Sequence, residues 1–175
     1  MKFKIDVKQI FKSILLAIAI FLPIIIFFNS QSKKQAYRMY KNRQIYFGNY
    51  VERRSGGRGT VNYVYDFKIK NNNIKGSMST ASFPNNTPYI GQEFIVLYNG
   101  FDPSESSMFF NLRVTDSIKK HFKKGPLRNI PIESYQRSID SFYYISFFKG
   151  ISKFIPPYYT KEDFPELEYL WGEEE

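Results

Sequence analysis

The sequence predicts an α+β protein with an N-terminal transmembrane helix, a small antiparallel five-strand β-barrel or sandwich, and a C-terminal helix with a short tail. Three observations lead to this fold class. An apolar block without a charge runs from Ile14 to Phe28. The chain contains 18 Phe and 14 Tyr, and aromatic side chains pack well on a pleated sheet. Apolar residues recur every second position in the middle of the chain, and every third or fourth position in its last third.

The apolar block follows a basic N-terminus, residues 1–12, and predicts a transmembrane helix over residues 13–29. Counted from Ile10 to Phe28, the segment approaches the roughly 20 residues that cross a bilayer core of about 30 Å. A cleaved secretory signal is the alternative, since a basic start and a short apolar core are typical of one. Ser30 and Ser32 offer small residues near a cut, but no Ala-x-Ala site is present. The length favours a retained signal anchor.

A basic juxtamembrane stalk, residues 30–43, follows the predicted helix. Basic residues beside a membrane span are attracted to anionic lipid headgroups, by about 1 kcal/mol each near the surface. Membrane lipid is therefore the expected partner of this stretch, and nucleic acid is not. The predicted membrane-surface residues are Lys33, Lys34, Arg38, Lys41 and Arg43.

Residues 44–115 carry the pattern of a β-domain. Its clearest strand is Val61–Ile69, where apolar and polar residues alternate. The turns are rich in Gly, Asn, Asp and Pro, which favour tight turns, and Asn71-Asn72-Asn73 is expected to reverse the chain. Short strands at this spacing predict a barrel or sandwich. The other strands are expected at Ile45–Val51, Ile74–Ser79, Glu93–Tyr98 and Met108–Val114.

The last third is predicted as a basic loop over 116–131, a helix over 132–150 and a Pro-containing acidic tail over 151–175. Helical spacing relates Ile132, Tyr135, Ile139, Phe142 and Tyr143, and Gly150 is a candidate cap. The tail has a short apolar face that either packs back on the domain or meets a partner protein. The candidate partner-binding residues on that face are Phe164, Leu167, Leu170 and Trp171.

Residue types that carry catalysis or bind metals are scarce. The chain has no cysteine, which excludes disulfides, thiolate metal sites and cysteine nucleophiles. The single histidine, His121, stands among lysines, whose charge disfavours a bound cation. No phosphate-binding, dinucleotide-binding or zinc motif occurs, and no carboxylates are paired for acid–base chemistry. We therefore predict no catalytic site, no metal and no cofactor, and a protein that is not an enzyme.

Six short motifs follow one another along Gln44–Leu112. They are Gly48-Asn49-Tyr50-Val51, Arg54-Ser55-Gly56-Gly57-Arg58-Gly59, Tyr65-Asp66-Phe67-Lys68-Ile69, Asn73-Ile74-Lys75-Gly76-Ser77, Ile90-Gly91-Gln92-Glu93-Phe94-Ile95-Val96-Leu97-Tyr98 and Asp102-Pro103-Ser104-Glu105-Ser106-Ser107. With these motifs the stretch resembles a bacterial family of small membrane-associated β-domains of unknown function. Two features depart from the family pattern: Gln92 replaces a usual acidic residue, and Asp102-Pro103 replaces Asn-Pro. The resemblance implies a β-barrel-like module and provides no activity or site residues.

These features together predict a single-pass membrane protein whose β-domain binds or scaffolds other proteins at the membrane. An open strand edge or the acidic tail would engage the partner. Two other classes fit the same features: an accessory subunit of a larger envelope secretion or transport complex, and an immunity protein that blocks a toxin. The expected location is the bacterial inner membrane with the domain outside the cytoplasm, although the basic flanks of the helix are nearly balanced.

Overall fold

The computed structural model describes residues 7–56, 60–80, 88–148 and 154–170, and the chain divides into two compact units. One unit combines Met1–Ala36 with Phe142–Glu175, and we call it the helical unit. The other, Tyr37–Ser141, contains the sheet, and we call it the β-unit. Helices α1 and α3 each contribute residues to both units.

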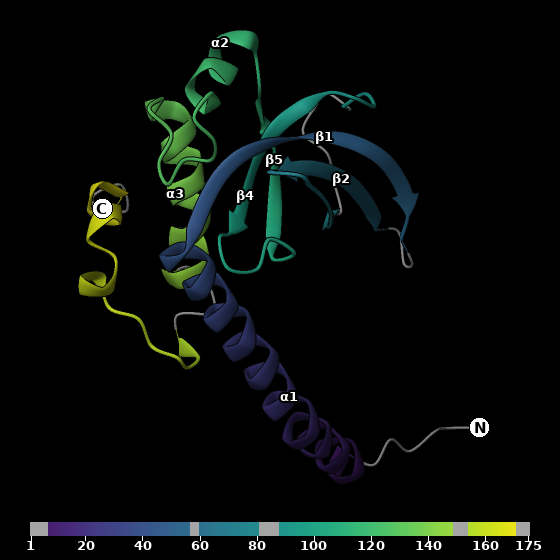
Figure 1. Cartoon of the computed structure of the whole chain (residues 1–175). Coiled ribbons are helices and arrows are strands. Elements are labelled where there is room, and N and C mark those ends of the chain that lie inside the picture. Colours follow the sequence, from purple (N-terminus) through teal and green to yellow (C-terminus); the bar gives the residue numbers. More distant parts are fainter. Residues whose placement is uncertain (1–6, 57–59, 81–87, 149–153, 171–175) are drawn as a thin grey trace. The chain divides into compact units, whose positions relative to one another are not determined.

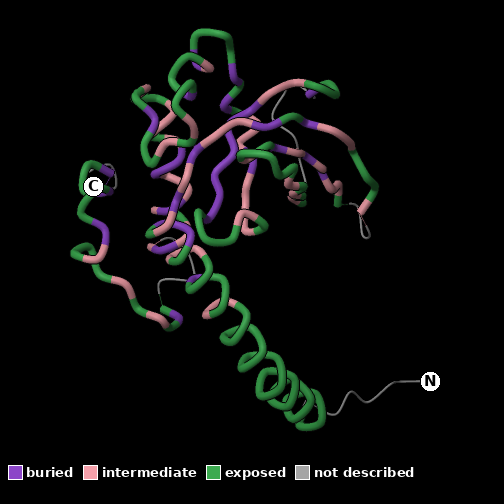
Figure 2. The backbone as a smooth tube through the Cα atoms, in the orientation of Figure 1, coloured by how far each residue is buried: buried purple, intermediate pink, exposed green. Residues whose placement is uncertain are grey.

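Helix α1 runs without interruption over Val7–Lys41. Its 35 residues span about 52 Å at 1.5 Å per residue, well beyond the roughly 30 Å core of a bilayer. It is the one helix among the described residues that is long and apolar enough to cross a membrane. Every residue from Lys8 to Phe28 is exposed, as the lower part of α1 in Figure 2 shows. The block therefore has no protein core to cover it, and the stalk continues the same helix.

The β-unit is built on one antiparallel sheet of five strands in the order β3-β2-β1-β4-β5 (Figure 1). The turn between β2 and β3 is shorter than the asparagine run suggested, because Lys70 takes the left-handed conformation (φ 53°) and Asn72 already belongs to β3. The strands are β1 Arg43–Ser55, β2 Val61–Ile69, β3 Asn72–Thr80, β4 Glu93–Asn99 and β5 Ser106–Arg113.

The prediction of a barrel or sandwich is wrong, because the described residues of the β-unit form a single sheet and that sheet is not closed. The sheet does curve: the Tyr65 hydroxyl on β2 lies 3.1 Å from Ser106 Oγ at the start of β5. However, β3 and β5 end the strand order and do not pair with each other over their described residues. Turn chemistry in the sequence indicates which strands form hairpins. Closure depends on strand tilt and stagger, which turn chemistry does not report.

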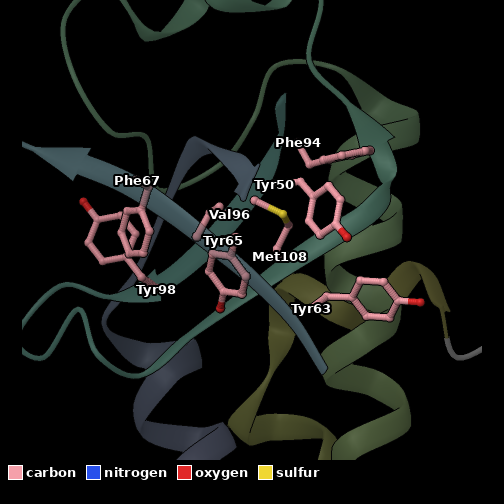
Figure 3. Close-up of a cluster of buried hydrophobic side chains, with 8 residues drawn as sticks. All are labelled: Tyr50, Tyr63, Tyr65, Phe67, Phe94, Val96, Tyr98 and Met108. Carbon is pink, nitrogen blue, oxygen red and sulfur yellow. The ribbon is translucent and has the colours of Figure 1, made fainter. Parts of the chain in front are cut away.

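The concave face of the sheet holds the main aromatic core (Figure 3). The ring of Phe110 on β5 contacts one aromatic ring from each of three other strands. Its centroid lies 6.0 Å from that of Tyr50, 5.5 Å from that of Tyr63 and 5.2 Å from that of Phe94. Edge-to-face pairs of this kind contribute about 0.5–1.5 kcal/mol each beyond their burial. The buried members of the cluster are Tyr50, Tyr63, Tyr65, Phe67, Phe94, Val96, Tyr98 and Met108.

The opposite face of the sheet is also buried. Ile95 and Leu97 alternate with the concave-face residues of β4, and both are completely inaccessible to solvent. The predicted basic loop contributes a short helical segment here: α2 Asp116–Lys119 and the 3-10 turn η2 Lys120–Phe122. The ring of Phe122 lies 5.6 Å from that of Phe47. Residues 116–122 are therefore helical, whereas the sequence predicted a loop there.

The C-terminal helix is observed as α3, Glu133–Phe148, which shows part of the predicted 132–150 segment. Gly150, the candidate cap, lies outside the described residues. In the helical unit, Phe147 of α3 stacks on Phe164 with ring centroids 4.2 Å apart. Two 3-10 segments flank Phe164 in the tail: η4 Lys161–Asp163 before it and η5 Pro165–Leu170 after it.

Candidate basic groove

A groove opens in the β-unit where β1 changes partners. Residues Asn49–Ser55 of β1 pair with β2, whereas Arg43–Asn49 pair with β4. The ladder between β1 and β2 therefore stops at Asn49 and Asp66, and the remaining residues of the two strands diverge. An added Cβ at Gly48 would overlap the Asp66 carbonyl oxygen and lie 2.9 Å from Phe67 Cβ. Only glycine permits the two backbones to approach so closely at the point of divergence.

The segment after η2 forms the third side of the groove. Leu127 pairs with Ile45 through two backbone hydrogen bonds of 2.6 and 2.8 Å, on the side of β1 that β2 has left. Gly125, with φ of 109°, closes the preceding turn in a conformation that favours glycine. These contacts hold Phe122–Pro126 beside the first half of β1 and the end of β2.

The groove has a volume of about 770 Å³ and a basic, aromatic lining. Its charged residues are Lys68 at the end of β2, Lys70 in the β2–β3 turn, and Lys123 and Lys124 from the segment after η2. No Asp or Glu lines it, and these four lysines form no ion pair among the described residues. The groove therefore favours an anionic occupant over a cationic or neutral one.

The aromatic wall of the groove consists of Tyr46, Tyr98 and Phe122. The rings of Tyr46 and Phe122 meet edge to face at 5.6 Å. Burial, with a smaller contribution from the neighbouring Tyr46, raises the pKa of Tyr98 to about 12. The Tyr98 hydroxyl is therefore neutral at physiological pH, and it adds no negative charge beside the lysines.

Another lysine of this region is already neutralised. Lys119 Nζ lies 2.5 Å from Glu93 Oε2, and this hydrogen bond raises the pKa of Lys119. Lys119 does not line the groove, so the positive charge that faces the groove comes from the four lysines alone.

The structure divides the five predicted membrane-surface residues into buried and exposed ones. Lys33 and Arg43 are buried, at 3% and 2% exposure. Lys33 Nζ donates to the Ile155 carbonyl oxygen at 2.9 Å. Arg43 donates to Asn129 Oδ1 at 2.8 Å, and its guanidinium lies 4.6 Å from the centre of the Tyr40 ring. Both side chains serve internal hydrogen bonding, which a count of basic residues in a sequence cannot reveal.

The other three predicted residues, Lys34, Arg38 and Lys41, are exposed. Arg38 forms an ion pair with Glu105 at 3.1 Å, so part of its charge is balanced within the β-unit. The Lys41 ammonium lies 5.5 Å from the centre of the Tyr37 ring. Lys34 and Lys41 therefore carry exposed charges that no ion pair among the described residues balances.

The predicted partner-binding face of the tail is used inside the helical unit. Phe164 and Leu167 are completely buried and Leu170 is 4% exposed. Besides Phe147, the Phe164 ring contacts Phe148 at 5.7 Å and Tyr159 at 5.5 Å. Trp171 lies outside the described residues. The described part of the tail therefore packs on α3 and Tyr159 within its own unit.

His121 stands on the 3-10 turn η2, exposed and among lysines. Over the described residues, no group of three or more His, Cys, Asp or Glu side chains is arranged to hold a metal ion. Asp66 lies 3.3 Å from the Asn49 amide nitrogen and Glu93 pairs with Lys119, so both carboxylates have structural partners.

The groove was not predicted from the sequence. Lys123 and Lys124 belong to the predicted basic loop over 116–131, whereas no site was predicted at Lys68 or Lys70. The two pairs are about 55 residues apart in the sequence. They meet only because β1 leaves β2 at Gly48, and the only sequence signal for that is a glycine inside a strand, which often marks a close backbone approach.

Comparison with known proteins adds no relative: no family model, curated protein or solved structure matches this chain. The resemblance of Gln44–Leu112 to small bacterial β-domains therefore rests on its own sequence motifs alone.

Proposed function

We propose that this chain is a single-pass, membrane-anchored, non-enzymatic binding protein, and that the basic groove of its β-unit receives an acidic segment of a partner protein. The observation that carries the proposal is the groove itself, with its four lysines and no carboxylate. A volume of about 770 Å³ is large enough for several side chains of an extended polypeptide. Aromatic residues next to lysines suit a segment that mixes acidic and apolar residues.

The apolar helix supports the membrane part of the proposal. It is fully exposed from Lys8 to Phe28, and lipid is the environment in which such a surface is stable. Anchoring confines the β-unit to a thin layer, which raises the effective concentration of a groove that binds weakly. A recruiting role follows: α1 fixes the location, and the groove selects partners by charge.

The edge strands offer a second contact for the same partner. β3 is an edge strand, and its described side chains alternate between exposed and half-buried. Its outer backbone groups are available for an added strand. The tail, by contrast, contributes less than the sequence suggested, because Phe164, Leu167 and Leu170 are buried.

The test uses the full chain in nanodiscs and a fluorescent peptide of alternating Glu and Leu residues, measured by anisotropy. We expect saturable binding that weakens as salt increases. Reversal of two groove charges, Lys123→Glu with Lys124→Glu, should weaken it at least tenfold, because attraction is replaced by repulsion.

A matched control separates the groove from the general charge of the protein. Arg53→Glu with Arg128→Glu makes the same change in net charge at two exposed residues that neither line the groove nor lie on β3. This variant should keep at least half of the affinity. Equal losses in the two variants, or equal binding of a Lys-Leu peptide, would show that the groove is not the site.

A further inference from the structure

A short segment of the helical unit, Phe154–Tyr158, is fastened to helix α1. The buried Lys33 ammonium donates to the carbonyl oxygen of Ile155 at 2.9 Å and lies 3.5 Å from that of Pro157. In return, the Tyr159 hydroxyl donates to the Lys33 carbonyl oxygen at 3.4 Å. A charged donor bonded to buried carbonyls contributes more than a neutral hydrogen bond. The segment is therefore held at a defined level along α1.

In a bilayer whose core holds the apolar block, that level would fall in the headgroup layer. Lys33 stands five residues after Phe28, the end of the apolar block, which corresponds to about 7–8 Å along the helix axis. The headgroup layer on each side of a bilayer is about 5–8 Å thick, from a total of roughly 40–45 Å around a core of about 30 Å. With the block in the hydrocarbon core, Ile155 and its neighbours lie at the headgroup layer.

The segment presents two aromatic side chains outward at this level. Phe154 is 70% exposed and Tyr158 is 68% exposed, whereas Ile155 between them is buried. The Tyr158 hydroxyl donates to the Phe154 carbonyl oxygen at 3.2 Å, which holds the two residues together. Tyr has an apolar ring and a polar tip, and such side chains gather at membrane–water interfaces. Lys34 on α1, one residue beyond Lys33, is exposed as well.

We propose that Phe154–Tyr158 is an interfacial membrane anchor, whose two aromatic side chains lie in the headgroup layer, beside the acyl chains, of the bilayer that holds α1. This inference rests on the membrane anchoring in the proposed function and goes beyond it by adding a second attachment point. The apolar surface of both rings is removed from water, and the Lys33 hydrogen bonds transmit this attachment to α1. The helical unit is then held at two points, which restricts its rotation about the α1 axis.

The test measures depth in the membrane at single positions of the full chain. Because the chain has no cysteine, Phe154→Cys and Tyr158→Cys each provide one site for a fluorescent label. Both side chains are exposed, so these substitutions leave the packed core intact. The labelled protein is reconstituted in vesicles of phosphatidylcholine and phosphatidylglycerol with brominated acyl chains, which quench a label only at close range. We expect strong quenching at both positions.

Two reference positions make the result decisive. A label at Ile20→Cys reports the middle of the apolar block, and a label at Glu162→Cys reports an exposed position on η4. The proposal requires quenching at 154 and 158 to exceed that at 162 severalfold. Quenching at 20 without quenching at 154 and 158 overturns the interfacial anchor and leaves the membrane span intact. An unquenched label at 20 overturns the span and the interfacial anchor together. If a second copy of the chain covered positions 154 and 158 in place of lipid, neither label would be quenched by the acyl chains. This outcome also counts against the proposal.

Discussion

Gly48 is the residue on which the shape of the groove depends. Its missing side chain lets the Asp66 carbonyl and Phe67 approach β1, and the two strands separate directly after this contact. The neighbours are backbone and a fully buried aromatic residue, so neither can move aside cheaply.

Gly48→Ala should therefore destabilise the β-unit by about 1–3 kcal/mol, the usual range for overpacking a well-filled site. Denaturant unfolding followed by circular dichroism measures this loss. Ser77→Ala, a small change at an exposed position of β3, serves as the control and should stay within about 0.5 kcal/mol of the wild type. Equal stability of Gly48→Ala and the wild type would mean that the strands can separate without the close contact.

Ionisation of Tyr98 lowers the free energy of unfolding of the β-unit at alkaline pH. Its pKa is raised from 10.0 in the unfolded chain to about 12 in the fold. The stabilisation is fully present below pH 10, and it is lost as the pH rises through the folded pKa near 12, because the unfolded chain releases this proton first. The loss amounts to about 2–3 kcal/mol for a shift of about two units.

Tyr98→Phe removes the ionising group, so its unfolding free energy should fall less steeply between pH 10 and 12 than that of the wild type. Denaturant titrations at a series of pH values measure both slopes. Tyr158→Phe, at an exposed position, is expected to keep the wild-type slope. Identical slopes for all three proteins would mean that groups other than Tyr98 cause the alkaline loss of stability.

At the scale of elements, the tail is a structural part of the helical unit. Phe164 is completely buried against Phe147, Phe148 and Tyr159, and the turn before it is closed by a capping box between Thr160 and Asp163. Removing a buried phenyl ring costs about 3–5 kcal/mol, which exceeds what a short segment can lose and remain docked.

Phe164→Ala should consequently release η4 and η5, and trypsin should then cleave after the exposed Lys161 at least tenfold faster. Mass spectrometry of timed digests identifies the cut. Glu168→Ala changes an exposed residue of the same tail and should leave the rate of cleavage unchanged. If Phe164→Ala is cleaved no faster than Glu168→Ala, the tail is held by contacts other than this ring.

Local patterns predicted the elements of this chain well and their assembly poorly. The alternation in Val61–Ile69 and the uncharged run Ile14–Phe28 are both local signals, and they appear in the structure as strand β2 and within helix α1. Closure of the sheet and the groove depend on where β1 changes partners, which is a long-range event. Lys33 and Arg43 show the same limit, since only their distant carbonyl and amide partners reveal them as internal residues.

At the scale of the whole molecule, the proposed function requires that the apolar block stays in the protein and in the bilayer. A retained anchor and a cleaved signal predict different chains in the cell. The retained anchor keeps Ile14–Phe28, and the chain resists extraction from membranes at alkaline pH. A cleaved signal would leave a shorter chain, released by the same treatment, and residues of the block would no longer matter for its location.

Ile20→Lys combined with Ile24→Lys tests this directly, because a lysine at the centre of a spanning helix costs about 2.5–3.5 kcal/mol, and two approach the whole gain of insertion. We expect the wild type to remain in the carbonate-washed membrane pellet at its full-length mass, and the double variant to be lost from it. Ser32→Lys combined with Gln35→Lys adds the same charge beyond the block, where α1 is exposed, and should remain in the pellet. A wild-type chain that is shortened near Ser30 and washed from the membrane would exclude anchoring. The groove would then have to find its partner without confinement to a surface, and peptide binding measured in nanodiscs should match that in free solution.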